Sequence, residues 1–120
     1  MTLKQLIRSL MSISIVCCMM ILGGIPVAQA DAVAEGQKIA FDRKKGNCMT
    51  CHMMAGATLA GNIGPPLIAM KARYPDKAKL RAQIWDPSAT NPNSIMPPFG
   101  LHRILTEKEI DLVTEYIHSL

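Results

Sequence analysis

The stretch Cys48-Met49-Thr50-Cys51-His52 places two thiols three positions apart and an imidazole directly after the second thiol. On a helical turn, residues i and i+3 share one face, so both sulfurs can reach the two vinyl groups of one porphyrin. The histidine that follows can then bind the iron. Each position in this pattern has a chemical role. The pattern predicts one covalent haem c, held by thioether bonds from Cys48 and Cys51, with His52 as an axial iron ligand.

Three other uses of a Cys-x-x-Cys pair fit the remainder of the chain less well. A redox dithiol expects a βαβ context, and no strand-like run is present in the sequence. A zinc site needs a second ligand pair, whereas His102 and His118 lie far from the motif and do not repeat its spacing. A disulfide within the motif would close a very small loop and would stabilise the fold little.

Residues 1–30 are predicted to be a cleaved secretory signal peptide. The segment Met1–Arg8 is basic, residues 10–22 form an almost unbroken apolar run, and Ala28-Gln29-Ala30 has the small-x-small pattern of a cleavage site. An uncleaved membrane anchor is the alternative. It is disfavoured because the apolar run is shorter than the roughly 20 residues that span a bilayer.

Removal of this segment leaves residues 31–120 as the mature protein, which we expect in the periplasm and free of the membrane. Lipid attachment at Cys17 or Cys18 is disfavoured because neither follows the required small-residue pattern. The two motif cysteines are then the only mature thiols. Two basic residues are also lost, so the formal net charge falls from +4 to +2. A charge this small makes nucleic-acid binding a poor interpretation.

A second axial ligand is expected on the opposite side of the porphyrin from His52. Met96 precedes Pro97-Pro98-Phe99-Gly100, and a proline-stiffened loop can hold a thioether at a fixed distance from the iron. Met70 and His102 are the alternatives. Three further methionines lie too close to the histidine in sequence to circle the ring, and they are expected to pack at the haem edge: Met49, Met53 and Met54.

The rest of the chain is predicted to form helices joined by irregular loops. Residues Asp31–Phe41 have the pattern of a short amphipathic helix. Loop chemistry, rich in glycine and proline, is expected between His52 and Pro75. Asp76 is predicted to cap a second helix that ends before Pro87. Val33, Gln37 and Phe41 are expected to share one face of the first helix, and Leu80 and Ile84 one face of the second.

The C-terminal segment gives the clearest helical signal. Thr106-Glu107-Lys108-Glu109 is a capping box. Apolar residues then recur with helical spacing at Ile110, Val113, Ile117 and Leu120. A core of about 90 residues with few aromatic rings would be marginally stable alone, so a haem is expected to fill its centre. The order of helix, haem motif, loops and helix predicts an all-α, class I cytochrome c fold for residues 31–120.

A closer resemblance covers residues 46–120 and includes long stretches outside the haem motif. The stretches that carry it are GNCMTCH at 46–52, GNIGPPLIAMKARYPDKAKLRAQIWD at 61–86 and NPNSIMPPFGLHRILTEKEID at 91–111. They resemble SoxX, the family of small monohaem cytochrome subunits of the thiosulfate-oxidising Sox system. The resemblance implies a periplasmic complex with a SoxA-like cytochrome, a SoxAX-type L-cysteine S-thiosulfotransferase that couples thiosulfate to a carrier-protein cysteine and releases two electrons.

In such a complex the chain would be the electron outlet to a downstream cytochrome c and would not be catalytic alone. The resemblance also implies the haem attachment and ligand set of Cys48, Cys51, His52 and Met96. Pro65 resembles the class I proline whose carbonyl accepts the second N–H of the proximal histidine. The haem motif itself does not separate this subunit from a freely diffusing periplasmic electron carrier that serves other oxidoreductases, so both interpretations stay open.

Three sets of residues keep two interpretations each. An exposed apolar patch at the haem edge is expected as the partner surface, with Met49, Met53, Met54 and Phe99 as candidates that are equally compatible with the interior. Trp85 is expected either against the haem or in the core. Basic residues are expected either to steer an acidic partner or simply to be solvated: Arg43, Lys44, Lys45, Lys71, Arg73, Lys77, Lys79 and Arg81.

Overall fold

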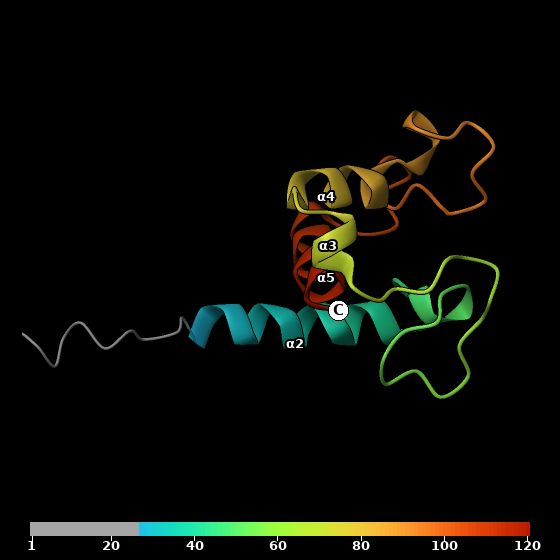
Figure 1. The fold of residues 1–120 in the computed structure, drawn as a ribbon. Helices are drawn as coiled ribbons and strands as arrows, with labels where there is room; N and C mark the ends of the chain where they lie inside the picture. Colours follow the sequence, from blue (N-terminus) through green and yellow to red (C-terminus); the bar gives the residue numbers. More distant parts are fainter. Residues whose placement is uncertain (1–26) are drawn as a thin grey trace, which may run out of the picture.

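The computed structural model describes residues 27–120, and within that range it contains helices and loops but no β-strand (Figure 1). The all-α prediction is therefore confirmed for the described residues. Most of the predicted signal peptide lies outside them, and residues 27–30 form the first turn of α2. The elements are α2 (Val27–Phe41), η1 (Cys48–Thr50), α3 (Met70–Arg73), α4 (Lys77–Trp85), η2 (Pro87–Ala89) and α5 (Glu107–Ser119).

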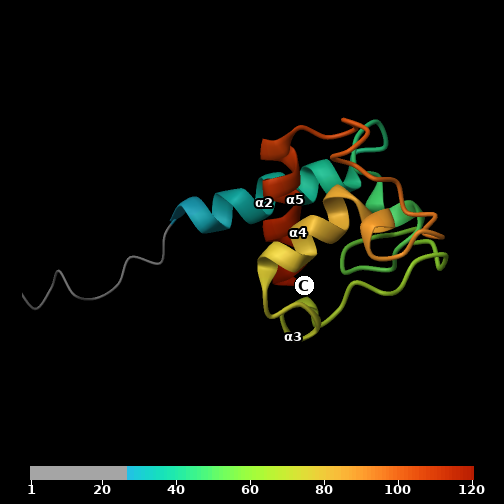
Figure 2. The same ribbon diagram turned by 90° about the horizontal axis from the view of Figure 1, so that it is seen from above.

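Helices α2 and α5 cross in close contact, although they are far apart in sequence (Figures 1 and 2). Gly36 lies at the crossing, where a Cβ atom would stand 1.9 Å from the carbonyl oxygen of Leu112. Only a residue without a side chain lets the two backbones approach this closely. The Phe41 and Tyr116 rings extend the contact, with their centroids 6.1 Å apart.

The buried face of α2 differs from the predicted one. Gly36, Ile39 and Ala40 are buried, whereas Gln37 is exposed. Val33 and Phe41 are half-buried at the margin of the core. The prediction for Gln37 was wrong because the contact stripe follows i, i+3 and i+4 from a glycine, and a glycine adds nothing to a hydrophobic pattern.

The predicted caps of α4 and α5 are confirmed. The Asp76 carboxylate accepts the N–H of Ala78 at 2.9 Å, which satisfies a free donor at the start of α4. At the start of α5, the Thr106 hydroxyl accepts the Glu109 N–H at 3.3 Å and the Glu109 carboxylate accepts the Thr106 N–H at 2.9 Å. The expected faces are buried at Leu80, Ile84, Ile110, Val113 and Ile117, while Leu120 is half-buried.

The short helix α3 occupies part of a segment predicted to be loop. One helical turn is too short to show a periodic pattern, so the sequence gives no signal for it. The helix follows Ala69, which has a left-handed backbone (φ 51°). The N–H of Ala69 donates to the carbonyl oxygen of Leu120 at 3.0 Å, and Met70 is almost fully buried. Tertiary contacts with the end of α5 therefore support this turn.

The two long irregular segments lie at the same end of the molecule. In both ribbon views, the loop after η1 and the loop after η2 lie on the side away from the first turn of α2, and in Figure 1 the loop after η2 stands above the loop after η1 (Figures 1 and 2). In Figure 1, the helices α2, α4 and α5 lie mainly to the left of these two loops. The helical scaffold thus presents two loops to one region of space, which is where the sequence-predicted site residues meet.

Candidate functional site

A cavity of about 680 Å³ lies between the two loops and the helices. This volume is within the range of about 300–1,000 Å³ that is usual for small-molecule and cofactor sites. The cavity is lined by the motif Cys48, Cys51 and His52 and also by Met96. Apolar side chains from α3, α4, α5 and the loops complete its wall: Leu67, Met70, Leu80, Ile84, Phe99, Leu105, Val113 and Ile117.

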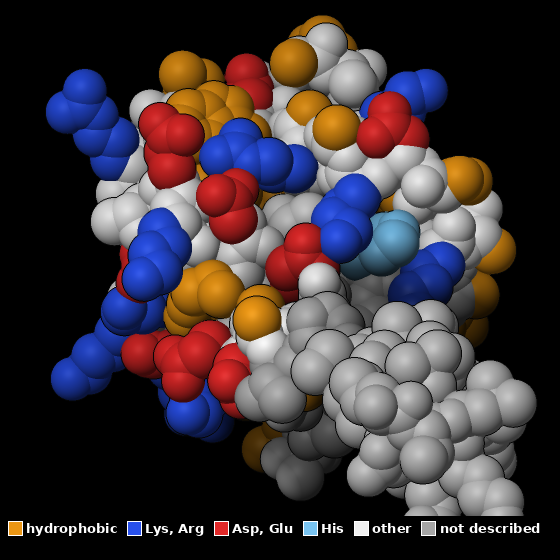
Figure 3. Space-filling model, turned by 90° about the vertical axis from the view of Figure 1, so that its left-hand side faces the viewer, with side chains coloured by type: hydrophobic (Ala, Val, Ile, Leu, Met, Phe, Trp, Pro, Cys, Tyr) orange, Lys and Arg blue, Asp and Glu red, His pale blue; other side chains and the backbone are white. Residues whose placement is uncertain are grey.

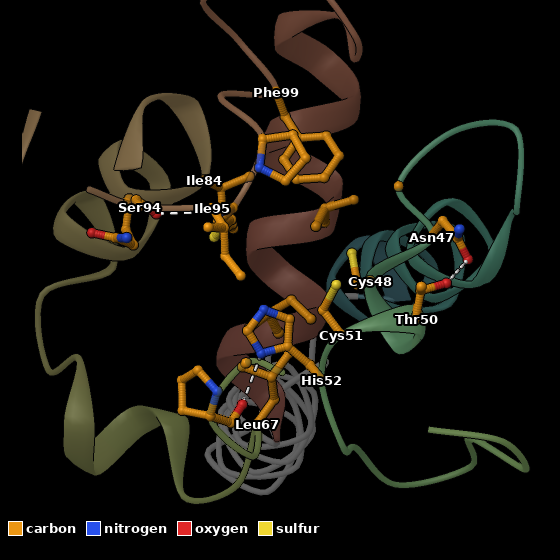
Figure 4. Close-up of a pocket in the computed structure, with 18 of the residues that line it drawn as sticks. Asn47, Cys48, Thr50, Cys51, His52, Leu67, Ile84, Ser94, Ile95 and Phe99 are labelled. Atoms are coloured by element: carbon orange, nitrogen blue, oxygen red, sulfur yellow. Dashed lines mark hydrogen bonds between the residues drawn. The ribbon is translucent and has the colours of Figure 1, made fainter. Parts of the chain in front are cut away.

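The Cys-x-x-Cys-His segment forms a tight helical turn. The N–H groups of Cys51 and His52 both donate to the Cys48 carbonyl oxygen, at 3.2 and 3.0 Å. Asn47 opens the turn with a left-handed backbone (φ 46°), and its side-chain oxygen accepts the Thr50 hydroxyl at 2.7 Å. The two sulfurs and the imidazole consequently border one space (Figure 4).

The chemistry of the thiols disfavours the alternatives to haem. Cys48 and Cys51 are both free, so they are not a disulfide. Burial raises the pKa of the Cys48 thiol to about 11. A redox dithiol needs the opposite shift, because the thiolate is the reactive form. Within residues 27–120, no cluster of three histidine, cysteine or acidic side chains could hold a metal ion without a porphyrin.

His52 is oriented by a backbone carbonyl. Its Nδ1 lies 2.7 Å from the carbonyl oxygen of Pro65 (Figure 4). Since a carbonyl only accepts, Nδ1 carries the proton, and Nε2 is left with the lone pair that a metal needs. The backbone of Gly64 lies against the ring, where a Cβ atom would stand 2.5 Å from His52 Cε1. The contact that the SoxX resemblance implied for Pro65 is therefore present in the fold.

The loop after His52 is tied back onto the motif by main-chain hydrogen bonds. The N–H of Gly61 donates to Met49, that of Gly64 to Cys51 and that of Leu67 to Met53, at 2.8 to 2.9 Å. The Arg73 guanidinium donates to the carbonyl oxygen of Pro66 at 2.6 Å. We call residues 47–73 the proximal segment, because each of these bonds helps to fix His52.

The three candidates for the second ligand differ in their surroundings. Met96 is half-buried and lines the cavity, on the loop that follows η2. Met70 also lines the cavity, but its sulfur lies 3.4 Å from the Arg73 guanidinium within the proximal segment. His102 is exposed and does not line the cavity. Of the three, Met96 is the one that approaches the cavity from a different segment than His52, and its role as a ligand stays a prediction.

The four candidates for an exposed partner patch are mostly not at the surface. Met53 is exposed, but Met54 and Phe99 are buried and Met49 is half-buried. The structure instead exposes isoleucines that line the cavity: Ile63, Ile95 and Ile104. Sequence reasoning missed them because each lies in a loop without a periodic pattern. Ile63 precedes Gly64 and Ile95 follows Ser94, which was a weak signal for loop positions, and Ile104 carried no such signal.

Trp85 and the basic residues also receive definite places. Trp85 does not line the cavity; it packs against Gly100, and the Arg81 guanidinium lies 5.4 Å from its ring centroid. Of the two places expected for Trp85, the structure therefore does not show the one in the cavity wall. Three of the basic residues form ion pairs across elements, Lys45 with Glu109, Lys77 with Glu115, and Arg81 with Asp111. On the face shown in Figure 3, basic side chains accordingly lie among acidic ones.

The residues of the cavity fit a covalently attached haem. Two thiols and an imidazole stand on one turn, a second sulfur ligand candidate stands on another loop, and the remaining wall is apolar. A helical fold with this site defines a c-type cytochrome of class I. The model of the cytochrome c family matches residues 33–120, so the chain belongs to the cytochrome c family. It carries one haem c, bound at the Cys-x-x-Cys-His turn.

Two individual proteins are similar to this chain, one in fold and one in sequence. One chain of the crystal structure of SoxXA from P. pantotrophus superposes with a TM-score of 0.65, at 24% identity, over 72% of this chain and 79% of that chain. An uncharacterized lipoprotein of Aquifex aeolicus (strain VF5) is 38% identical over 77 residues. That match covers 63% of this chain and 37% of the relative, so the chain spans little more than a third of the relative's length.

None of the helices formed by residues 27–120 combines the length and the apolar character needed to cross a bilayer.

Proposed function

We propose that this cytochrome is the electron-transfer subunit of a SoxAX-like complex, in which a second, SoxA-like cytochrome is its partner. The observation that carries the proposal is the placement of His52 and Met96 on two separate segments that line one cavity. With His52 and Met96 as ligands, the chain would occupy both ligand positions of the iron outside the porphyrin. An iron whose ligand positions are all occupied can transfer electrons, but it has no free position at which a substrate could bind.

The ligand roles are part of the proposal. Cys48 and Cys51 would form the two thioether bonds, His52 would bind the iron through Nε2, and Met96 would bind it through its sulfur. Pro65 orients His52 and, by accepting its N–H, raises the basicity of the imidazole. The haem supplies one-electron redox chemistry at its iron, and the chain supplies orientation, an apolar wall and exclusion of water.

The substrate chemistry is assigned to the complex and not to this chain alone. Thiosulfate would be coupled oxidatively to a cysteine of a carrier protein, with the release of two electrons. A single haem accepts one electron at a time, so this chain would pass the two electrons in succession to a downstream cytochrome c. The support is the likeness in fold to a chain of SoxXA, together with the stretches at 61–86 and 91–111 that resemble SoxX.

The partner surface is proposed at the cavity mouth. Exposed isoleucines of both loops flank the cavity there, namely Ile63, Ile95 and Ile104. Arg43 and Lys44 also border the cavity, which gives the apolar rim a basic neighbour. At this mouth the haem of this chain would come closest to a haem of the partner, which would shorten the path of electron transfer. We expect the association rate with an acidic partner to fall as ionic strength rises.

The proposed location of the protein rests on its covalent haem and on the signal peptide predicted for residues 1–30. We propose that residues 1–30 direct export and are removed, so that residues 31–120 act in the periplasm. Residues 27–30 of α2 would then be lost, and the part of α2 that crosses α5 at Gly36 would be retained.

The test is affinity purification of the holoprotein from cells grown on thiosulfate, followed by haem staining and mass spectrometry of the bound proteins. A stoichiometric second haem protein is expected. The recovered complex is then mixed with the carrier protein, and reduction of this chain's haem by thiosulfate is followed by absorbance. Thiosulfate should reduce the haem only when both partner and carrier are present.

A substitution separates the docking surface from the cofactor. Ile95→Ser should weaken capture of the partner and leave the haem spectrum unchanged, whereas Leu59→Ser, at an exposed position away from the cavity lining, is the matched control. Recovery of the cytochrome alone at low salt, with reduction by several unrelated donors, would favour the freely diffusing carrier instead.

A further inference from the structure

The segment that carries Met96 begins next to Trp85 in the sequence and comes back to Trp85 at its other end. It begins at Asp86, directly after Trp85, and at its other end the N–H groups of Gly100 and Leu101 donate to the Trp85 carbonyl oxygen at 3.1 and 3.3 Å. Residues 86–100, which we call the distal loop, are thus closed at their base in the manner of an Ω-loop. Met96 lies within this closed segment.

The base of the distal loop is also closed by side-chain packing. Gly100 is buried, and a Cβ atom there would stand 2.1 Å from Cδ2 of the Trp85 ring. The Arg81 guanidinium lies 5.4 Å from the ring centroid and donates to the Asp111 carboxylate at 2.6 Å. The indole is therefore fixed to α5 through Arg81 and provides the surface onto which Gly100 fits.

The two halves of the distal loop are supported differently. Before Met96, side-chain hydrogen bonds recur: Thr90 donates to Gln83 at 2.9 Å, and the Met96 N–H donates to the Ser94 hydroxyl at 3.2 Å. After Met96 come two prolines, which have no N–H to donate. The buried Phe99 and the contact of Gly100 with Trp85 are the anchors that follow.

We propose that the contact between Trp85 and Gly100 is the latch that holds Met96 at the haem iron. Trp85 is a positioning residue, since it acts on the ligand through the base of the distal loop. When the latch opens, Met96 leaves the cavity and the distal face of the haem becomes accessible to a small exogenous ligand. The inference rests on the proposed role of Met96 as the second axial ligand.

The latch makes a quantitative prediction for ligand binding. An exogenous ligand binds only the open form, so its apparent dissociation constant equals the intrinsic constant divided by the open fraction. Gly100→Ala forces the indole or the loop to move, because the added methyl group has no room. We expect the open fraction to rise about tenfold, and the apparent affinity of the ferric haem for imidazole to rise about tenfold with it.

The experiment compares two glycine substitutions in the ferric holoprotein. Gly100→Ala acts at the latch, whereas Gly36→Ala creates a clash of similar severity at the α2 and α5 crossing. For each variant, imidazole affinity and the near-infrared sulfur-to-iron band are measured beside the urea unfolding midpoint. The latch predicts weaker sulfur ligation and tighter imidazole binding in Gly100→Ala alone, even if both variants lose similar global stability. Equal imidazole affinities at matched stability would overturn it.

A second pair of variants keeps the test decisive if Gly100→Ala fails to retain its fold. Trp85→Leu removes the indole and should raise imidazole affinity, and Trp85→Phe should restore part of the difference because a ring remains. In the Trp85→Leu background, the added methyl of Gly100→Ala should have little further effect. Independent effects of the two substitutions would contradict the latch. A wild-type protein without the sulfur-to-iron band would overturn the Met96 assignment itself, whereas an intact band with unchanged imidazole affinity in all variants would overturn the latch alone.

Discussion

The proximal segment and the distal loop line the same cavity but are held in place by different means. In the proximal segment, main-chain hydrogen bonds recur along the chain, from Gly61 to Met49, from Gly64 to Cys51 and from Leu67 to Met53. The distal loop is closed at its base on Trp85, and two prolines follow Met96, the proposed second ligand. The proximal segment is tied to the haem motif at several points, whereas the distal loop is closed at its base and has side-chain hydrogen bonds only before Met96.

The difference predicts that the two sides fail separately. Thioether bonds would keep the haem attached to the proximal segment even when other parts of the chain unfold. A sulfur ligand on a closed loop can leave the iron by local opening, which costs less free energy than global unfolding. The site thus combines a permanent attachment with a reversible one, and substitutions on each side test this asymmetry.

The largest effect is expected from removal of the covalent attachment. In the double variant Cys48→Ala and Cys51→Ala, haem staining after denaturing electrophoresis should disappear, and the chain should lose its cooperative unfolding transition. The physical reason is that the apolar cavity of about 680 Å³ would be left without the group that fills it. Thr50→Ala, which alters the exposed side chain within the same turn, is the control and should retain the stain.

Loss of the distal ligand should have a smaller and more local effect. Met96→Ala should keep the covalent haem but lose the near-infrared sulfur-to-iron band, and the reduction potential should fall by roughly 0.1 V, within the about 0.8 V that axial ligands span. Met70→Leu is the matched control, because it conserves volume in the core and should cost less than about 1.5 kcal/mol of stability. If the band survived in Met96→Ala and vanished in Met70→Leu, Met70 and not Met96 would be the sulfur ligand of the iron.

The smallest effect concerns the attachment of the proximal side to α5. Lys45 precedes the motif and pairs with Glu109, and this ammonium together with the Thr106 N–H lowers the pKa of Glu109 from 4.5 to about 2. A lowered pKa in the folded state means that the pair stabilises the fold above about pH 4.5 and that this contribution is lost as the pH falls toward 2. The urea midpoint should therefore decline with acidification in this window.

Glu109→Gln should flatten that decline, while the sulfur-to-iron band should keep its pH dependence because the distal loop does not contact the pair. Glu107→Gln is the control at an exposed carboxylate of the same helix. A pH profile identical in the wild type and in Glu109→Gln would show that the pair contributes nothing to stability.

The helices and the haem turn could be predicted from the sequence because their signals are local. The capping box at Thr106 and the cap at Asp76 involve residues within three positions, and the Cys-x-x-Cys-His spacing fits one turn. The helix α3 could not be predicted, because tertiary contacts hold it. The α2 face was misread for a similar reason, since Gly36 is defined by the helix it meets and not by its own hydrophobicity.

The candidate site divides along the same line. Cys48, Cys51 and His52 come from one sequence motif. In the structure, Met96 lines the same cavity as these three residues. The position of Trp85 could not be inferred, because nothing in its neighbourhood in sequence indicates that Gly100 returns to it. Likewise, the burial of Phe99 and the exposure of Ile95 depend on how the distal loop closes.

The crossing of α2 with α5 also bears on the order of folding and haem attachment. Gly36 meets Leu112, and α2 packs mainly on α5, so this part of the fold forms only when the two ends of the chain come together. The Cys-x-x-Cys-His turn lies between them in sequence. We expect the exported chain to offer its two thiols for haem attachment before the crossing forms, and the docking of α5 to close the cavity around a cofactor that is already bound.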